Sequence, residues 1–188
     1  MKRLIIILVL FIPCCMIYAQ YSSNDYFGTW IYQSKDTVFT IKVQKTVMNV
    51  TWPKEEQVEF IVGGYSLNVK GVFTDNYMGD IPTMWKPTTR AQNSNIYFYG
   101  SYKEDEEKPF VTFFFFDQRK KHFNGEEAIS GGRMELISPT QLHWTLNEKK
   151  GIIFKEGWVS ELIGFSVPTD VIMTKEVFTP KNKKNQNP

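Results

Sequence analysis

The sequence predicts an all-β protein, built as one antiparallel barrel or sandwich of about eight to ten strands. Apolar and polar residues alternate with period two in several segments, for example in Thr37–Lys45, where Phe39, Ile41 and Val43 share one face. Turn signals rich in Gly, Pro, Asn and Asp separate these segments. No segment after the N-terminal leader carries a helical stripe of any length, so short turns and strands account for most of the chain.

The other strands follow from the same alternation. Gln57–Val62 and Tyr65–Val69 flank the pair Gly63-Gly64, which predicts a bulge or a sharp bend in one long strand pair. Further strands are predicted at Asn95–Lys103, Phe110–Asp117, Arg133–Ile137, Gln141–Asn147 and Asp170–Val177. Predicted turns include Asp75-Asn76, Gly131-Gly132 and the hairpin connection Ser138-Pro139-Thr140.

Two segments do not follow the strand pattern. Tyr77–Thr89 contains prolines and aromatic residues and is expected to be an ordered loop. Glu148–Phe165 mixes glycines with large apolar residues. It is expected to be either a strand with a long loop or a short helix that covers an open end of the barrel.

The N-terminus has the layout of a secretory signal. Lys2 and Arg3 form a positive start, Leu4–Ile12 is an unbroken apolar run, and Ala19 provides a small residue for cleavage before Gln20. The run is too short for a permanent membrane anchor, so no stable membrane span is expected after cleavage. We expect a signal peptide over 1–19, a β-domain over 20–179 and a disordered polar tail over 180–188. The protein would be periplasmic or secreted; the alternative is a lipoprotein with its lipid on Cys14 or Cys15.

Removal of the leader changes the charge and the cysteine count. Both cysteines lie in the leader, so the mature domain depends on core burial without disulfides. Residues 20–179 contain 17 basic and 20 acidic side chains. This balance excludes the basic footprint of a nucleic-acid-binding protein. The sequence leaves the oligomeric state open.

The segment Phe27-Gly28-Thr29-Trp30 begins soon after the expected cleavage site. A Gly-x-Trp motif at this place resembles the signature of lipocalins and the wider calycin barrels. The resemblance implies that Trp30 closes one end of the barrel. It also implies that a basic residue of the last strand, here Lys175, stacks on the indole ring through a cation–π contact.

A wider resemblance links the chain to an uncharacterised family of small exported proteins of flavobacteria and other Bacteroidetes. It rests on Gly28-Thr29-Trp30, Phe39-Thr40-Ile41, Gly64-Tyr65, the element Phe165–Thr169 and Thr174-Lys175, which occur in this order. The family implies no activity and no catalytic residues. The segment between Phe73 and Asn95 departs from its pattern.

Aromatic residues are the candidate ligand contacts. Phe113–Phe116 is a run of four phenylalanines that places large rings on both faces of a strand. One face is expected to be core, and the other either lines a cavity, is covered by another segment or serves as a contact surface. Trp144 alternates with leucines and is expected in the core. Candidates for binding a small apolar or amphipathic ligand are Trp85, Phe98, Phe113 and Phe115, with Trp85 either at a barrel mouth or docked on its own barrel.

Catalysis has little support in the sequence. Neither His122 nor His143 has a partner at metal-ligand spacing, and no nucleophile or phosphate-binding motif occurs. We therefore expect no metal, no cofactor and no catalytic residues. Carboxylate clusters such as Glu55-Glu56 or Glu126-Glu127 would support a hydrolase only if two of them faced each other across a cleft.

These patterns give two hypotheses. The first is an exported, non-catalytic, lipocalin-like protein that holds a small apolar ligand inside its barrel. The second is a filled barrel that acts through its surface, as an interaction or structural module of the cell envelope.

Overall fold

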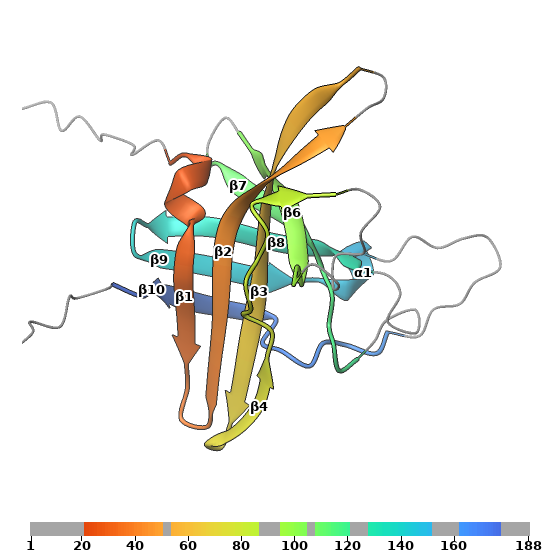
Figure 1. Ribbon diagram of the computed structural model, residues 1–188. Helices are drawn as coiled ribbons and strands as arrows, with labels where there is room; N and C mark the ends of the chain where they lie inside the picture. Colours follow the sequence, from red (N-terminus) through yellow and green to blue (C-terminus); the bar gives the residue numbers. More distant parts are fainter. Residues whose placement is uncertain are drawn as a thin grey trace, which may run out of the picture.

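A computed structural model describes residues 21–50, 54–86, 95–104, 108–120, 128–151 and 162–177 (Figure 1). The strands in these residues are β1 (Gly28–Gln33), β2 (Thr37–Val50), β3 (Glu56–Val69), β4 (Val72–Asn76), β5 (Met84–Trp85), β6 (Phe98–Lys103), β7 (Phe110–Phe115), β8 (Ile129–Ser138), β9 (Gln141–Leu146) and β10 (Asp170–Lys175). A 3-10 turn, η1 (Ser23–Tyr26), precedes β1, and one helical turn, α1 (Glu148–Gly151), follows β9. No helix in these ranges is long and apolar enough to cross a membrane.

Eight of the strands close into an antiparallel barrel of the lipocalin or calycin type. Around the wall the order is β1, β2, β3, β6, β7, β8, β9 and β10, and β10 pairs with β1 to complete the ring. Short β4 extends the ladder at the end of β3, and β5 pairs in parallel with the outer part of β2. The predicted all-β class is therefore confirmed, and the barrel rather than the sandwich is the architecture.

Strands β2 and β3 form the longest hairpin of the molecule. They pair in unbroken register along 14 residues each, so the ladder holds no bulge at Gly63-Gly64, and that part of the prediction is wrong. The two glycines instead admit neighbours on opposite faces. A Cβ on Gly63 would lie 1.9 Å from Cζ of Phe98 inside the barrel, and a Cβ on Gly64 would lie 2.0 Å from the Tyr77 carbonyl oxygen outside it.

Two predicted turns lie within strands. Asp75-Asn76 ends β4, and Gly131-Gly132 lies in β8. Gly131 has a φ of 109°, next to the point where the β7–β8 register shifts, so this glycine pair belongs to a bulge and not to a chain reversal. The Ser138-Pro139-Thr140 connection, in contrast, joins β8 to β9 as predicted.

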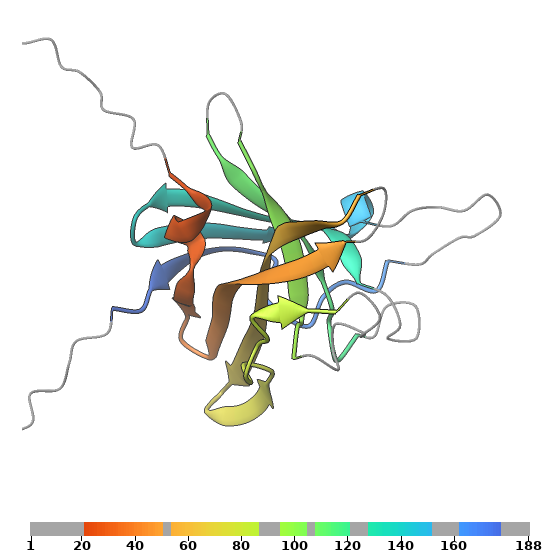
Figure 2. The same cartoon turned by 45° about the horizontal axis from the view of Figure 1, so that its top comes forward.

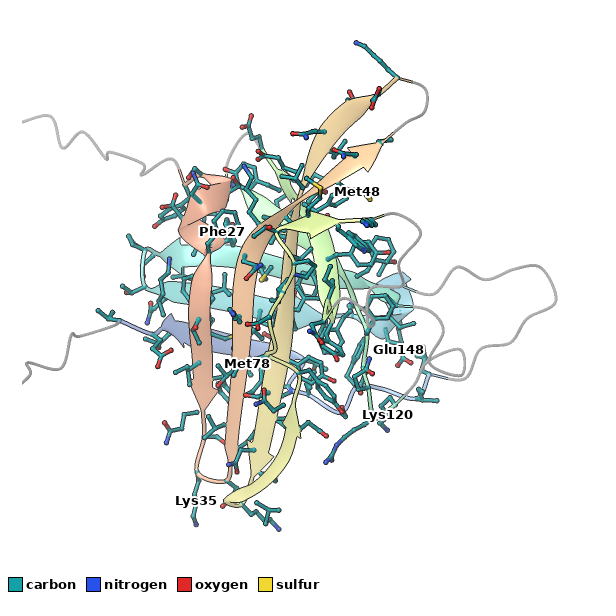
Figure 3. The ribbon with its side chains drawn as sticks, viewed as in Figure 1. Phe27, Lys35, Met48, Met78, Lys120 and Glu148 are labelled. Atoms are coloured by element: carbon teal, nitrogen blue, oxygen red, sulfur yellow. The ribbon has the colours of Figure 1, made fainter. Side chains whose placement is uncertain are left out.

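The end of the barrel opposite η1 is held by two buried carboxylates, of which Glu148 is labelled in Figure 3. Glu148 accepts hydrogen bonds from the backbone N–H groups of Ile163 (2.9 Å) and Gly164 (2.8 Å). Asp117 accepts from the N–H and the hydroxyl of Ser166 and from two amides of its own turn, those of Arg119 and Lys120. These bonds fasten the segment that leads into β10. For Glu148–Phe165 the sequence predicts either a strand with a long loop or a short helix. The structure has one helical turn, α1, at the start of this segment, and residues 152–161 lie outside the described residues.

Candidate functional site

The η1 end of the barrel is closed by the Gly-x-Trp strand. Trp30 is completely buried, and its Nε1 donates to the carbonyl of Tyr26 at 2.8 Å. Lys175 lies opposite Trp30 in the β1–β10 ladder. The Lys175 ammonium is 4.9 Å from the centroid of the Trp30 ring and donates to the Asp25 carbonyl at 2.8 Å. One lysine thus joins the last strand, the buried indole and the turn that covers this end.

Four rings of the interior core pack together, and we call them the interior cluster: Phe98, Phe113, Phe115 and Trp144. All four are at most 2 % exposed. The centroid of the Trp144 ring lies 4.5 Å from that of Phe113 and 5.8 Å from those of Phe98 and Phe115. Three of the four predicted ligand contacts, Phe98, Phe113 and Phe115, therefore belong to one cluster of mutually packed rings.

Glycines in the wall allow the interior cluster to pack this closely. A Cβ on Gly132 of β8 would have the Phe113 ring as its nearest contact, at 2.3 Å. A Cβ on Gly100 of β6 would lie 2.0 Å from the Thr112 carbonyl oxygen and 2.7 Å from the Phe113 backbone. Gly132 is paired with Phe113 in the β7–β8 ladder, so the ring covers the bare backbone of a neighbouring strand of the wall.

The fourth predicted contact, Trp85, lies outside the barrel. Its ring packs edge-on against Phe60 of β3 (6.0 Å) and Tyr99 of β6 (5.1 Å). Phe114 of β7 stacks on Tyr99 at 5.0 Å with an interplanar angle of 12°. We call Phe60, Trp85, Tyr99 and Phe114 the outer aromatic cluster. The sequence leaves Trp85 either at a barrel mouth or docked on its own barrel, and in the structure it is docked on the barrel wall.

The run of four phenylalanines divides between the two sides of the wall. Phe113 and Phe115 belong to the interior core, whereas Phe116 is buried in a second core with Val62, Ile81 and Ile96. Phe114 keeps 41 % of its surface exposed. The segment that contains Ile81 and Trp85 thus covers much of the outer face, and Phe114 remains accessible at its edge.

A third feature is a notch between β3 and β6, which the sequence patterns do not predict. The last residue pair that joins these strands is Ile61↔Gly100. Beyond it the β2–β3 and β6–β7 hairpins splay apart (Figure 2). The notch is a surface pocket of about 240 Å³, lined by Ser23, Phe27, Lys45, Glu59, Phe60, Ile61, Ser101 and Tyr102.

The notch has an apolar floor and a charged rim. Phe27, labelled in Figure 3, follows η1 and packs on the main core together with Tyr102. Lys45 and Glu59 form an ion pair across the β2–β3 hairpin, and both side chains remain substantially exposed. Only the strand order reveals this site, because it places Ser101 of β6 beside residues of β3 that lie some forty positions earlier.

The predicted chemistry of the histidines can be followed only for His143. Its Nε2 lies 2.7 Å from Oδ1 of Asp170, on the outer surface of β9 and β10. His122 and the Glu126-Glu127 pair lie outside the described residues. Within the described ranges, no three His, Cys, Asp or Glu side chains gather as a metal-ligand set.

The fold and these surfaces define a closed, antiparallel eight-stranded barrel with aromatic rings packed inside it. The chain belongs to DUF6705, a family of unknown function whose model matches residues 1–176. No match was found among the curated proteins or among the solved structures.

Proposed function

We propose that the protein is an exported, non-catalytic binding module that contacts a partner polypeptide through the outer surface of a filled barrel. The observation that carries this proposal is the interior cluster, in which Trp144 contacts three phenylalanine rings and the Phe113 ring lies against the bare backbone of Gly132. The leader-like residues 1–19 favour a periplasmic or secreted location. A packed interior favours the second sequence hypothesis over the carriage of a ligand inside the barrel.

The outer aromatic cluster supports a protein partner. Aromatic side chains bury a large area with few rotatable bonds and dominate the binding energy of protein interfaces. Phe114 is 41 % exposed and Met84, beside Trp85, is 53 % exposed. Their neighbours Tyr99 and Trp85 pack against the second core, which holds this part of the outer surface in place.

Site-specific photo-crosslinking tests this proposal in the native source. A photoreactive phenylalanine analogue is placed at Phe114 in one variant and at Ile172 in a matched control. Both positions are exposed and apolar, but Ile172 lies on β10, away from the cluster. We expect a discrete crosslinked polypeptide from position 114 only. Equal yields from both positions would contradict a specific outer surface.

A further inference from the structure

We infer that the β3–β6 notch binds one ring of a neutral carbohydrate. This inference goes beyond the proposed function, because it concerns a small-molecule site and does not require a polypeptide partner. Three observations carry it: aromatic rings fixed in the floor of the notch, an ion pair at its rim with unused donors and acceptors, and serine hydroxyls on its walls that have no partner in the described part of the chain.

The floor of the notch offers aromatic rings that are already held in place. The Tyr102 hydroxyl donates to the Tyr21 carbonyl, and the Tyr102 ring packs edge-on against Tyr26 with the centroids 6.1 Å apart. Phe27 packs on the main core, and buried Ile61 closes the floor from β3. Rings that are fixed before binding lose little conformational entropy when a ligand packs on them. The C–H face of a sugar ring is an apolar surface that suits such a floor.

The rim of the notch carries one positive and one negative side chain. Lys45 and Glu59 pair through Nζ and Oε1, and their side chains are 43 % and 63 % exposed. The pair uses one N–H of the ammonium and one oxygen of the carboxylate. Among the described residues, the remaining donors of Lys45 and Oε2 of Glu59 have no partner. A hydroxyl both donates and accepts, so two neighbouring hydroxyls of one ring match this adjacent donor and acceptor.

Two serine hydroxyls reach the notch from different elements. Ser23 belongs to η1 and Ser101 to β6, and both residues are partly buried. Neither side chain forms a hydrogen bond within the described ranges. Each hydroxyl is able to donate and to accept, so the notch presents polar groups on its walls as well as at its rim.

This lining selects a neutral, hydroxyl-bearing ring. The charges of Lys45 and Glu59 offset each other, so an ionic ligand of either sign meets one like and one opposite charge. A purely apolar ligand would displace water from the rim and leave its polar groups unpaired. The volume of about 240 Å³ lies below the roughly 300–1,000 Å³ of most small-molecule pockets, so the notch accepts a single ring.

The test is a titration of the isotope-labelled mature chain, followed by its amide chemical shifts. The probes are the methyl glycosides of glucose, galactose, mannose and N-acetylglucosamine. We expect at least one of them to shift the amides of Phe27, Glu59 and Ser101 with a Kd of about 5 mM or below. Because the ligand is neutral, this Kd should change less than twofold between about 50 and about 500 mM NaCl. If no glycoside shifts these amides at about 50 mM, well above that Kd, the inference is wrong.

Two further ligands separate carbohydrates from other classes without net charge. Cyclohexanol keeps an apolar ring with a single hydroxyl, and alanine is a zwitterion that would pair with both charges of the rim. Both should bind at least tenfold more weakly than the best glycoside. An equal affinity for cyclohexanol would show that the notch selects apolar rings, and an equal affinity for alanine would show that it selects zwitterions. Either result overturns the inference.

Matched variants locate the site. Glu59→Ala should weaken binding of the best glycoside at least fivefold, whereas Glu56→Ala, at an exposed position of the same strand outside the pocket lining, should not. Tyr102→Leu removes a ring of the floor and should also weaken binding at least fivefold. Tyr102→Phe keeps the ring and should bind more tightly than Tyr102→Leu. Equal Kd values for Glu59→Ala and Glu56→Ala would contradict the site, whether or not Tyr102→Leu folds.

The inference and the proposed function fail separately. If no glycoside binds but a native partner still crosslinks at Phe114, the surface function stands and the carbohydrate site is wrong. If a glycoside binds in the notch but no specific crosslink forms at Phe114, the carbohydrate site stands and the proposed polypeptide-binding surface is wrong.

Discussion

The ring of Phe113 lies directly on the backbone of Gly132. A Cβ added to this glycine would lie 2.3 Å from Cε2 of the ring, and its three nearest atoms would all belong to Phe113. The centroid of the same ring lies 4.5 Å from the centroid of the Trp144 ring. This arrangement specifies where the ring must be, so a change at Gly132 probes how tightly the barrel is filled.

The first prediction is that Gly132→Ala destabilises the protein by roughly 1–3 kcal/mol, because overpacking forces the ring out of a close-packed site. Urea denaturation followed by tryptophan fluorescence measures the loss. Phe113→Leu in the Gly132→Ala background should recover part of it, so the double-mutant cycle should show a favourable coupling. Gly71→Ala is the control, since a Cβ there meets nothing within 4 Å and the cost is backbone strain alone. Additive effects at Gly132 and Phe113 would mean that the ring has room to move.

The second prediction concerns the closed end. Lys175→Met removes the cation–π contact with Trp30 and the hydrogen bond to the Asp25 carbonyl, and should cost about 2 kcal/mol in the free energy of unfolding. Lys175→Arg keeps the positive charge and should retain most of the stability. Lys35→Met, in the exposed turn between β1 and β2, controls for the loss of a surface charge. If Lys175→Met and Lys35→Met are equally stable, the closing pair contributes nothing.

The third prediction concerns the opposite end. Asp117→Ala leaves the Ser166 N–H, the Ser166 hydroxyl and two turn amides without their acceptor. Since hydrogen bonds to a charged group contribute about 1.5–3 kcal/mol each, we expect a loss of at least about 3 kcal/mol. Ser166→Ala removes only the hydroxyl and should cost less. Amide exchange at Ser166 should accelerate in Asp117→Ala; unchanged exchange would show that Asp117 does not hold this segment.

The fourth prediction is a loss of stability at alkaline pH. Burial raises the pKa of Tyr26 from 10.0 to about 12, so the native state keeps the phenol protonated where the unfolded chain ionises it. The contribution of this group is complete below pH 10 and is lost as the pH rises toward about 12. The urea midpoint should therefore fall over this window, and phenolate absorbance should report late titration in the folded protein. In Tyr26→Phe the urea midpoint should fall less over this pH range. An identical fall in the variant would show that other groups cause the loss of stability.

Much of the fold could be predicted because strand periodicity is local. The alternation around Phe39 and Ile41 and the Ser138-Pro139-Thr140 turn each depend on neighbouring residues alone, and β2 and the β8–β9 hairpin follow from them. The sequence predicts a bulge or bend at Gly63-Gly64 and a turn at Gly131-Gly132. Both predictions miss the role of these glycines, because sequence alone does not show which ring comes close to a glycine. Phe98 and Phe113, which occupy that space, come from other strands.

The candidate site was less accessible to sequence analysis. The sequence indicates Phe98, Phe113 and Phe115 as candidate ligand contacts. The alternation along a strand does not show whether rings that face inward leave a cavity or fill it. The notch depends on where the β3–β6 ladder ends, at Ile61↔Gly100, and this is a property of the closed sheet. Ser101 and Tyr102 line the notch from β6, and only the strand order places them beside β3.

The filled interior is tested most directly by calorimetric titration of wild type and Phe113→Ala with benzene. Removal of a large buried ring creates an apolar cavity, and such cavities bind small apolar molecules. We predict no binding to wild type and a gain of one benzene site in Phe113→Ala, with Phe113→Leu as a milder variant if the alanine variant does not fold. A barrel that carries a ligand inside would instead bind benzene in the wild-type protein and bind it more weakly in Phe113→Ala. Stoichiometric binding to wild type that weakens when Phe113 is shortened would contradict the account.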